Sequence, residues 1–392
     1  MSIRVAVVIS HPIQHFCPQY ESWARLPGVD LKVFFAARIG MEAYFDPDFG
    51  QEVQWKGLRL DFEHAFLPGA EKRTTSTMIE AEGLDDALAA FRPDLVIAYG
   101  YTVPLQRRAI RWAKAHGAKL AMISDAELRT PRPAWKQAAK QLLVRQWIAK
   151  FDAFLTVGDG NEAYYRAYGA RDTQFFRSGF PIDTMAIDAA LADRERRSAE
   201  LRERMGIPGD HMVLMSVGKL IGRKRQEDLI RLSNRMAGAG VTVVLAGSGP
   251  DEEKLRPIAD RNGPGGVIFA GFVQPEELID YYLATDVYMH PASVDRHPLA
   301  VSEATYCGVP AVVSERIGSY GPSDDVQPGV NGFVHRLGDV GDMEASVRKL
   351  MDPALREEMS AASARIARAS QARAHGGALQ AMMRTMDLGA RA

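Results

Sequence analysis

The sequence predicts an α/β protein with two doubly wound parallel sheets. Short β-branched runs alternate with helical patterns, as in parallel sheets covered by helices. A charged stretch near residues 183–210 interrupts this alternation, which then begins again. The length of 392 residues also exceeds what one hydrophobic core usually supports. We therefore expect a first domain over 1–185, a linker over 186–210, a second domain over 211–365 and a C-terminal helix over 366–392 that returns toward the first domain.

Each half of the chain supplies its own series of elements. Apolar runs predict strands at 3–9, 31–36, 94–99, 119–123, 153–157 and 174–176 in the first half, and at 213–217, 241–246, 267–270, 287–290, 311–314 and 333–335 in the second. The segments between them predict helices at 19–26, 84–90, 104–115, 134–148, 161–168, 226–237, 252–261, 275–283, 342–351 and 354–386. Residues 37–80 are polar and aromatic, and we expect a long functional loop or a small excursion there.

The composition is that of an ordinary soluble globular protein. The formal net charge of −1 gives no global field that would recruit nucleic acid. Cys17 and Cys307 lie far apart in the sequence, which indicates neither a disulfide framework nor a zinc site and fits a reducing cytosol. The N-terminal apolar run is too short for a signal peptide, and no run approaches the ~20 residues of a membrane span. We therefore expect a cytoplasmic protein.

The most informative stretch is residues 286–310, which runs from a short strand through a polar loop into a helix ending at Gly308. Such a turn places backbone N–H groups and the positive helix end at the carboxyl edge of a sheet, where phosphates bind. Asp295 in the loop and Glu303 in the helix are carboxylates, so they suit hydroxyl groups of a sugar rather than the phosphate. The pattern favours a nucleotide-sugar site.

Three further motifs follow strands of the second half. Lys219 and Lys224 bracket a Gly-containing loop and could neutralise a diphosphate without a metal ion, although a solvated basic turn has the same pattern. The Gly-x-Gly at 247–249 fits either a phosphate loop or a tight turn before Pro250. The stretch 269–273 fits either the support of a flat base or core packing of its phenylalanines.

As an ordered set, these motifs resemble family 4 of the GT-B glycosyltransferases, which have two Rossmann-like domains facing across a cleft. The resemblance covers the second half through residue 334. In the first half, the His-Pro-Ile-Gln run at 11–14, together with Phe49-Gly50 and Trp55, resembles a bacterial subgroup of this family.

The resemblance implies retaining transfer of a sugar from a UDP- or GDP-sugar to a glycan, lipid-linked or protein-linked acceptor in bacterial cell-surface polysaccharide or glycoconjugate synthesis, with no cofactor and no metal. Front-face attack would let the departing diphosphate take the acceptor proton. Donor-binding residues by motif position are Gly218, Lys219, Lys224, Gly249, Phe272, Val273, Asp295, His297, Leu299, Ala300 and Glu303. Within this set, the two lysines would hold the diphosphate, Glu303 the ribose and Asp295 the donor sugar.

The chain departs from the family pattern beside the sugar. It has Lys219, Arg225 and Asp295 where the family usually has Arg, Gly and Glu, and Arg296-His297 where Gly-Phe is usual. We take these differences to indicate an unusual or acidic donor sugar, and we expect donor specificity to reside in 296–298.

Candidate residues of the first half follow its strands. Asp125 is the candidate to orient the acceptor hydroxyl or stabilise a cationic sugar, although Asp125 with Ser124 could equally cap a helix. With Asp125, the lysines and Asp295 form the candidate catalytic set. The candidate cleft residues of this half are His11, Gln14, His15 and Tyr101.

A basic amphipathic segment spans 129–150. Its cations and its apolar stripe could lie on an anionic bilayer, making the protein peripheral at the inner face of the membrane. The same stripe could instead pack on the first domain. The alternatives to a glycosyltransferase are a catalytically inactive GT-B binding protein or a sugar-nucleotide epimerase of GT-B-like fold. A phosphorylase would need a much longer chain.

Overall fold

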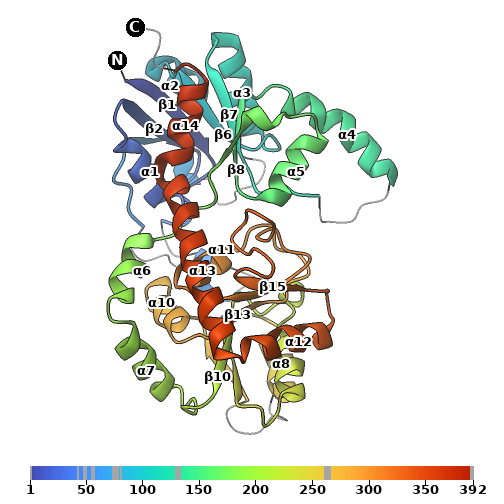
Figure 1. Cartoon of the computed structure of the whole chain (residues 1–392). Coiled ribbons are helices and arrows are strands. Elements are labelled where there is room, and N and C mark those ends of the chain that lie inside the picture. Colours follow the sequence, from blue (N-terminus) through green and yellow to red (C-terminus); the bar gives the residue numbers. More distant parts are fainter. Residues whose placement is uncertain are drawn as a thin grey trace.

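The computed structural model describes residues 2–41, 44–46, 51–53, 58–72, 79, 82–128, 134–259 and 266–388. Over these residues the chain forms two parallel sheets, each packed between helices, one in each half of the molecule (Figure 1). The predicted fold class is confirmed.

The N-terminal sheet has the strand order β5-β2-β1-β6-β7-β8-β9. Its strands are β1 (Ile3–Ile9), β2 (Val29–Phe35), β5 (His64–Phe66), β6 (Leu95–Tyr99), β7 (Lys119–Ile123), β8 (Ala153–Thr156) and β9 (Phe175–Arg177). The C-terminal sheet has the order β12-β11-β10-β13-β14-β15. Its strands are β10 (Met212–Val217), β11 (Val241–Ala246), β12 (Val267–Gly271), β13 (Val287–His290), β14 (Ala311–Ser314) and β15 (Gly332–His335).

Helices cover both faces of each sheet. In the N-terminal half they are α1 (Cys17–Ala24), α2 (Leu84–Phe91), α3 (Pro104–His116), α4 (Ala134–Ile148) and α5 (Asp159–Ala167). The remaining helices are α6 (Thr184–Leu191), α7 (Arg194–Arg204), α8 (Gln226–Arg235), α9 (Glu252–Ala259), α10 (Pro275–Leu283), α11 (Leu299–Tyr306), α12 (Val340–Leu350), α13 (Pro353–Ala372) and α14 (Ala378–Thr385).

Each sheet reverses its strand order at one central strand. β1 lies between β2 and β6, and β10 lies between β11 and β13. A reversal of this kind leaves an opening at the carboxyl ends of the strands, because the connecting helices leave in opposite directions. The candidate residues of both halves follow such strand ends.

The segment 37–80 contains more regular structure than a long loop. It includes strand β5, which pairs with β2, the antiparallel strands β3 (Tyr44–Asp46) and β4 (Gln51–Val53), and the 3-10 turn η1 (Ala70–Lys72). The predicted motif residues Phe49, Gly50 and Trp55 lie outside the described residues.

Residues 186–210 also form regular structure, in α6 and α7. Leu201 of α7 is buried, and Arg197 forms an ion pair of 2.6 Å with Asp280 of α10. The charged pattern therefore marks the outer face of a packed helix, and this segment lies against the C-terminal half.

The C-terminal helices run from the C-terminal half back along the N-terminal half (Figure 1). A π-helical turn at Arg373–Gly377 separates α13 from α14. The carbonyl of Ala374 in this turn accepts hydrogen bonds from Gln19 Nε2 (2.8 Å) and Trp23 Nε1 (3.1 Å) of α1. Beyond it, Leu379 and Met382 are buried in the N-terminal core, so the last helix belongs to that core.

Candidate active site

The loop that carries the two candidate lysines is shaped by backbone packing. Gly218 follows β10 with a φ of 142°. A Cβ on Gly247, which follows the neighbouring strand β11, would lie 2.0 Å from the Gly218 carbonyl oxygen. Only glycine allows two strand ends to approach this closely. The Lys219 carbonyl then accepts a hydrogen bond from Gln226 Nε2 at 3.0 Å.

The Gly-x-Gly motif serves the same packing. A Cβ on Gly249 would lie 2.5 Å from the carbonyl oxygen of Leu220, whose own N–H donates to Ser248 O at 2.9 Å. The glycines of this motif therefore let the β11 loop support the lysine loop. The Gly-x-Gly motif thus forms the tight turn that was one of its two alternatives. Its contact with the lysine loop was not apparent from the sequence.

Lys224 and Asp295 meet although 71 residues separate them in the sequence. Lys224 ends the 3-10 turn η3 (Gly222–Lys224), and its Nζ lies 2.5 Å from Asp295 Oδ2. Ser293 of the second loop donates from its N–H to Arg223 O at 2.8 Å, so the two loops are also joined through the backbone.

His290, at the end of β13, is a site residue that the sequence reasoning missed. It is buried, and its Nε2 lies 2.9 Å from Asp295 Oδ2. Burial would raise the pKa of Asp295, but the hydrogen bond from His290 and the Lys224 ammonium outweigh it and hold that pKa below its usual range. Burial lowers the pKa of His290, so a neutral imidazole donates to an ionised carboxylate. The signal for His290 in the sequence is its position as a polar residue at the end of an apolar strand.

Glu303 lies on the second turn of α11. Its Oε2 accepts a hydrogen bond of 2.6 Å from the hydroxyl of Tyr282 on α10. Burial raises the pKa of Glu303 to about 7, against the opposing effect of the Tyr282 hydrogen bond. The carboxyl group therefore titrates near neutral pH.

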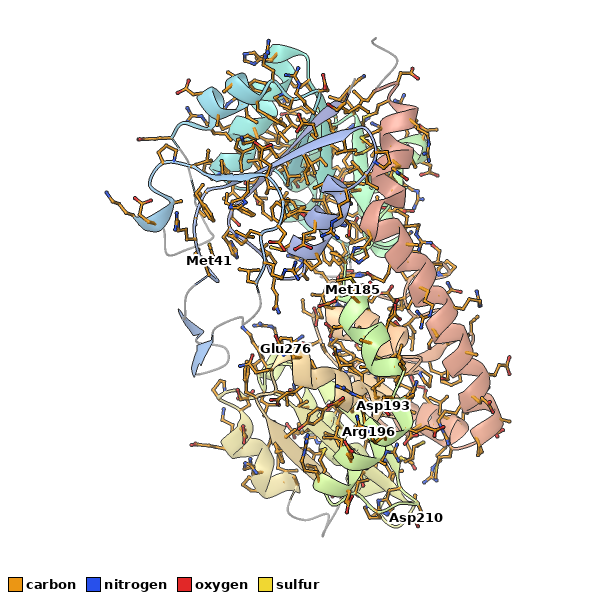
Figure 2. All side chains as sticks on the ribbon, turned by 90° about the vertical axis from the view of Figure 1, so that its left-hand side faces the viewer. Met41, Met185, Asp193, Arg196, Asp210 and Glu276 are labelled. Atoms are coloured by element: carbon orange, nitrogen blue, oxygen red, sulfur yellow. The ribbon has the colours of Figure 1, made fainter. Side chains whose placement is uncertain are left out.

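A cavity of about 360 Å³ joins the two halves at Glu303. Leu299, Tyr282 and Glu303 line it from the C-terminal half, and Gln14 and His15 line it from the N-terminal half. Met185 and Glu276, two further lining residues, lie at the level where the halves face each other in Figure 2. Of the donor candidates, only Leu299 and Glu303 line this cavity. The others do not line it, namely Gly218, Lys219, Lys224, Gly249, Phe272, Val273, Asp295, His297 and Ala300.

His297 is enclosed rather than displayed at an open surface. Its Nδ1 lies 3.3 Å from Ser319 Oγ and its Nε2 3.5 Å from Asp325 Oδ2. The ring also packs edge-on against Phe180 at 5.1 Å between centroids. Its described partners therefore belong to the 317–325 loop and the connection between the two halves.

Arg296 and Asp125 connect the two halves. Arg296 NH1 lies 3.3 Å from Asp125 Oδ1. The helix-cap alternative for Asp125 is wrong, because residues 124–128 form no helix and α4 is first described at Ala134. Ser124 Oγ instead lies 2.9 Å from the Tyr165 hydroxyl.

Of the other candidates of the N-terminal half, Gln14 and His15 line the cavity, whereas His11 and Tyr101 do not. His11 Nδ1 lies 2.9 Å from Ser10 Oγ, and burial lowers the pKa of His11 to about 4. Burial, with the charge of His297, lowers the pKa of His15 to about 3. Tyr101 is directed elsewhere: its hydroxyl lies 2.8 Å from the Tyr164 hydroxyl, and its ring stacks on Trp147 of α4. Tyr101 therefore does not line the cavity.

Helix α4 extends away from the N-terminal sheet (Figure 1). Of its described side chains, Val144 and Ile148 are buried, whereas Leu142 is 65% and Leu143 62% exposed. The described apolar residues of α4 therefore do not form one continuous exposed stripe: Val144 and Ile148 are packed inside, and Leu142 and Leu143 face solvent. The side chains of 129–140 lie outside the described residues. None of the described helices combines the length and apolar character needed to cross a bilayer.

Comparison with known families accounts for both halves. The model of the glycosyl transferase 4-like domain matches residues 6–176, and that of glycosyl transferases group 1 matches residues 197–366. A GDP-mannose-dependent alpha-mannosyltransferase of Corynebacterium glutamicum is 30% identical over 178 residues, which are 45% of this chain and 40% of that protein.

Two further proteins are similar over longer stretches. A GDP-mannose-dependent alpha-(1-6)-phosphatidylinositol dimannoside mannosyltransferase of Mycobacterium tuberculosis is 30% identical over 268 residues, which are 64% of this chain and 61% of that protein. The chain thus spans less than two thirds of these relatives. The crystal structure of HepE from Anabaena in complex with UDP superposes with a TM-score of 0.70 at 16% identity, over 99% of this chain and 100% of that one. The first half of the chain therefore matches the glycosyl transferase 4-like model and the second half the glycosyl transferases group 1 model, and the two halves are arranged in the GT-B fold.

Proposed function

We propose that this chain transfers a sugar, with retention of anomeric configuration, from a UDP- or GDP-sugar to a glycan, lipid-linked or protein-linked acceptor of bacterial cell-surface polysaccharide or glycoconjugate synthesis. The observation that carries the proposal is the ion pair of Lys224 with Asp295 at the carboxyl edge of the C-terminal sheet. A cation for diphosphate and a carboxylate for sugar hydroxyls meet there, and α11, the helix that follows the Asp295 loop, carries Glu303 into the cavity between the halves.

In this proposal Lys219 and Lys224 neutralise the diphosphate without a metal ion. The bond between the anomeric carbon and the diphosphate oxygen breaks while the acceptor oxygen forms a bond on the same face. The acceptor proton passes to the departing diphosphate, so no side chain has to accept it. Electrostatic support of the leaving group is then the main contribution of the protein. In this proposal Asp125, whose carboxylate pairs with Arg296, orients the acceptor hydroxyl.

A donor screen tests the activity. Purified protein is incubated with UDP- and GDP-sugars in the presence of EDTA, and released nucleotide is measured. We expect turnover of at least one donor, its loss in Lys224→Ala, and its retention in Lys254→Ala, a lysine on the exposed surface of α9. Water is the acceptor in this screen, so the anomeric configuration of the released sugar is read by NMR before mutarotation, and it should match that of the donor. Inverted product, or turnover that requires a divalent metal, would refute that part of the proposal.

We further propose that α4 brings this cytoplasmic protein to the anionic inner face of the membrane, where lipid-linked acceptors lie. The exposed Leu142 and Leu143, next to the exposed cations Arg145 and Lys150, support this proposal. Vesicles containing phosphatidylglycerol should bind the protein more than phosphatidylcholine vesicles do. The double variant Leu142→Asp, Leu143→Asp should lose this binding, whereas Val330→Asp, at an exposed residue of the C-terminal half, should keep it. Equal binding by both variants would exclude α4.

A further inference from the structure

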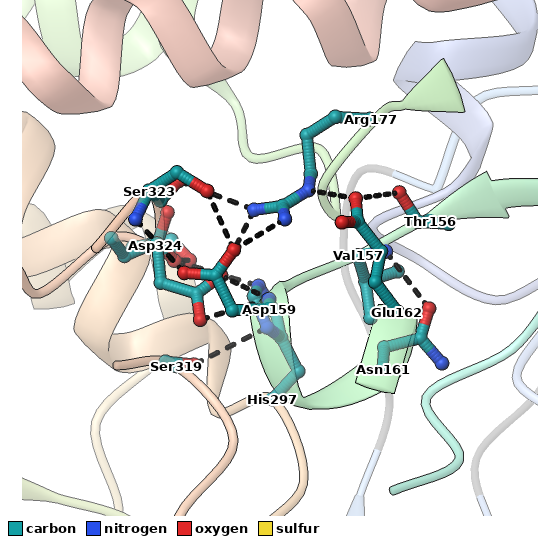
Figure 3. Close-up of polar contacts among 12 residues, drawn as sticks. Thr156, Val157, Asp159, Asn161, Glu162, Arg177, His297, Ser319, Ser323 and Asp324 are labelled. Carbon is teal, nitrogen blue, oxygen red and sulfur yellow. Dashed lines mark hydrogen bonds and ion pairs between the residues drawn. The ribbon is translucent and has the colours of Figure 1, made fainter. Parts of the chain in front are cut away.

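The loop before β15 contacts helix α5 of the N-terminal half through reciprocal hydrogen bonds (Figure 3). The backbone N–H of Asp159, at the start of α5, donates to both carboxylate oxygens of Asp324 at 3.0 Å. In return, the Asp159 carboxylate accepts from the N–H of Ser323 at 2.8 Å and from its hydroxyl at 2.6 Å. Four hydrogen bonds therefore connect two segments that are more than 160 residues apart.

Arg177, the last residue of β9, lies at the centre of this contact (Figure 3). Its guanidinium forms ion pairs with Asp159 at 2.6 Å, Glu162 at 2.9 Å and Asp324 at 3.2 Å. It also donates to the Ser323 carbonyl at 3.2 Å. One cation thus holds carboxylates from both halves of the chain.

Two glycines allow the segments to come this close. A Cβ on Gly158 would lie 2.6 Å from Asp324 Oδ1. A Cβ on Gly321 would lie 2.3 Å from Asp159 Oδ2. A side chain at either position would force the facing carboxylate to move, so glycine at 158 and at 321 leaves room for the contact on both sides.

The same loop continues into the candidate donor site. Asp325, the neighbour of Asp324, accepts a hydrogen bond of 2.5 Å from Ser302 Oγ of α11, directly before Glu303. It also lies 3.5 Å from His297. At the other end of the loop, the N–H of Gly318 donates to the carbonyl of Asp295 at 2.9 Å. Loop 317–325 therefore contacts α5 on one side and the carriers of both candidate carboxylates on the other.

The net free energy of this contact is small enough for the contact to form and break reversibly. Buried ion pairs contribute little net stability, because desolvation offsets their attraction. Here the single guanidinium of Arg177 faces three carboxylates, of which Asp324 is almost fully buried. Faces between domains of one chain are commonly mobile unless they are large and apolar. A contact of this kind can close on assembly of the site and open for product release without a large change in stability.

We propose that Arg177, Asp159, Ser323 and Asp324 form a latch, that is, a reversible contact that holds the two halves together. Loop 317–325 transmits the closure of this latch to Asp295 and α11. Arg177 is therefore a positioning residue for the donor site. The existence of the latch does not depend on the proposed function, whereas its effect on donor binding rests on that function.

Hydrogen exchange of the full chain without substrate tests the latch. Arg177→Gln should accelerate exchange about tenfold in 317–325 and in α11, equivalent to ~1.4 kcal/mol of opening free energy. Arg177→Lys should restore part of the protection. Arg196→Gln, at an exposed arginine of α7 that pairs with Asp193 and Glu200, should change neither segment. Unchanged exchange in both segments in Arg177→Gln would overturn the latch, and acceleration in 317–325 alone would overturn the transmission.

A steric variant covers the case in which loss of the arginine prevents folding. Gly321→Ala places a methyl group against Asp159 and should accelerate exchange in 317–325 and in α11. Unchanged exchange in both segments would overturn the latch here too, and acceleration in 317–325 alone would overturn the transmission. For the donor arm, Arg177→Gln should raise KM for the nucleotide-sugar several-fold more than it lowers kcat. If wild type turns over no donor, the proposed function fails while the exchange result still decides the latch.

Discussion

The Lys224 ammonium and the Asp295 carboxylate form an ion pair of 2.5 Å in which both side chains are about four-fifths buried. His290 contacts the same carboxylate oxygen at 2.9 Å. The carboxylate is thus fixed from two sides, and the Lys224 ammonium is held beside the carboxylate that we assign to the donor sugar. Through this pair, the diphosphate-binding and sugar-binding parts of the proposed site are mechanically linked.

The first prediction separates the two carboxylates. Glu303→Gln should weaken binding of the plain nucleoside diphosphate about tenfold, because a hydrogen bond to a charged group contributes ~1.5–3 kcal/mol. Asp295→Asn should leave plain nucleotide binding within a few-fold and lower sugar turnover instead. Calorimetry and steady-state kinetics measure the two effects. Equal loss of plain nucleotide binding in both variants would contradict this division.

The second prediction concerns His290. His290→Ala removes the donor that fixes Asp295, so kcat should fall about tenfold while KM changes little. His290→Gln retains an N–H donor and should recover part of the rate. His211→Ala, at a histidine that contacts Thr242 on the opposite edge of the sheet, is the matched control. A role in core packing alone would give loss of thermal stability in His290→Ala with no recovery of rate by glutamine.

The third prediction is a pH dependence of donor binding. Because burial raises the pKa of Glu303 from 4.5 to about 7, the folded protein keeps this proton where the unfolded chain has released it. The stabilising contribution is therefore complete below about pH 4.5 and is lost as the pH rises through 7. Ribose hydroxyls need the ionised carboxylate, so the Kd for an intact nucleotide-sugar should rise about tenfold from pH 8 to pH 6.

Intact nucleotide-sugar is the correct ligand for this measurement, because both of its phosphates are esterified and do not titrate near neutral pH. Glu303→Gln should flatten the profile. A wild-type profile without slope, or the same slope in the variant, would assign the pH dependence to another group.

The fourth prediction concerns the pair of Asp125 and Arg296. Their ion pair is exposed and should contribute no more than ~1 kcal/mol to stability. Asp125→Asn should nevertheless lower kcat about 100-fold if it orients the acceptor hydroxyl. This loss should persist in an Arg296→Gln background. If the loss disappears there, Asp125 acts only as a partner of Arg296.

The sequence predicted the parts of the site that strand ends bring together. Lys224 and Asp295 both follow strands of one parallel sheet, so their proximity follows from topology. His290 was missed because a histidine closing an apolar strand resembles core sequence. The charged run of α7 predicts a linker, because its buried residue, Leu201, is isolated among charges.

Contacts between the halves could not be predicted from local pattern. Arg177 and Asp324 are 147 residues apart, and neither stands in a recognisable motif. Within the C-terminal half, the contact of His297 with Asp325 likewise depends on the path of loop 317–325. Periodicity and spacing encode neither contact, because both arise from tertiary packing of segments that are far apart in the sequence.

Calorimetric titration of UDP- and GDP-sugars into the full chain and into Lys224→Ala, with Lys254→Ala as the control, tests the donor site directly. We expect one-to-one binding of at least one nucleotide-sugar, abolished in Lys224→Ala and unchanged in Lys254→Ala. Absence of binding by the wild type, or equal binding by Lys224→Ala, would contradict the assignment of this strand edge as the donor site.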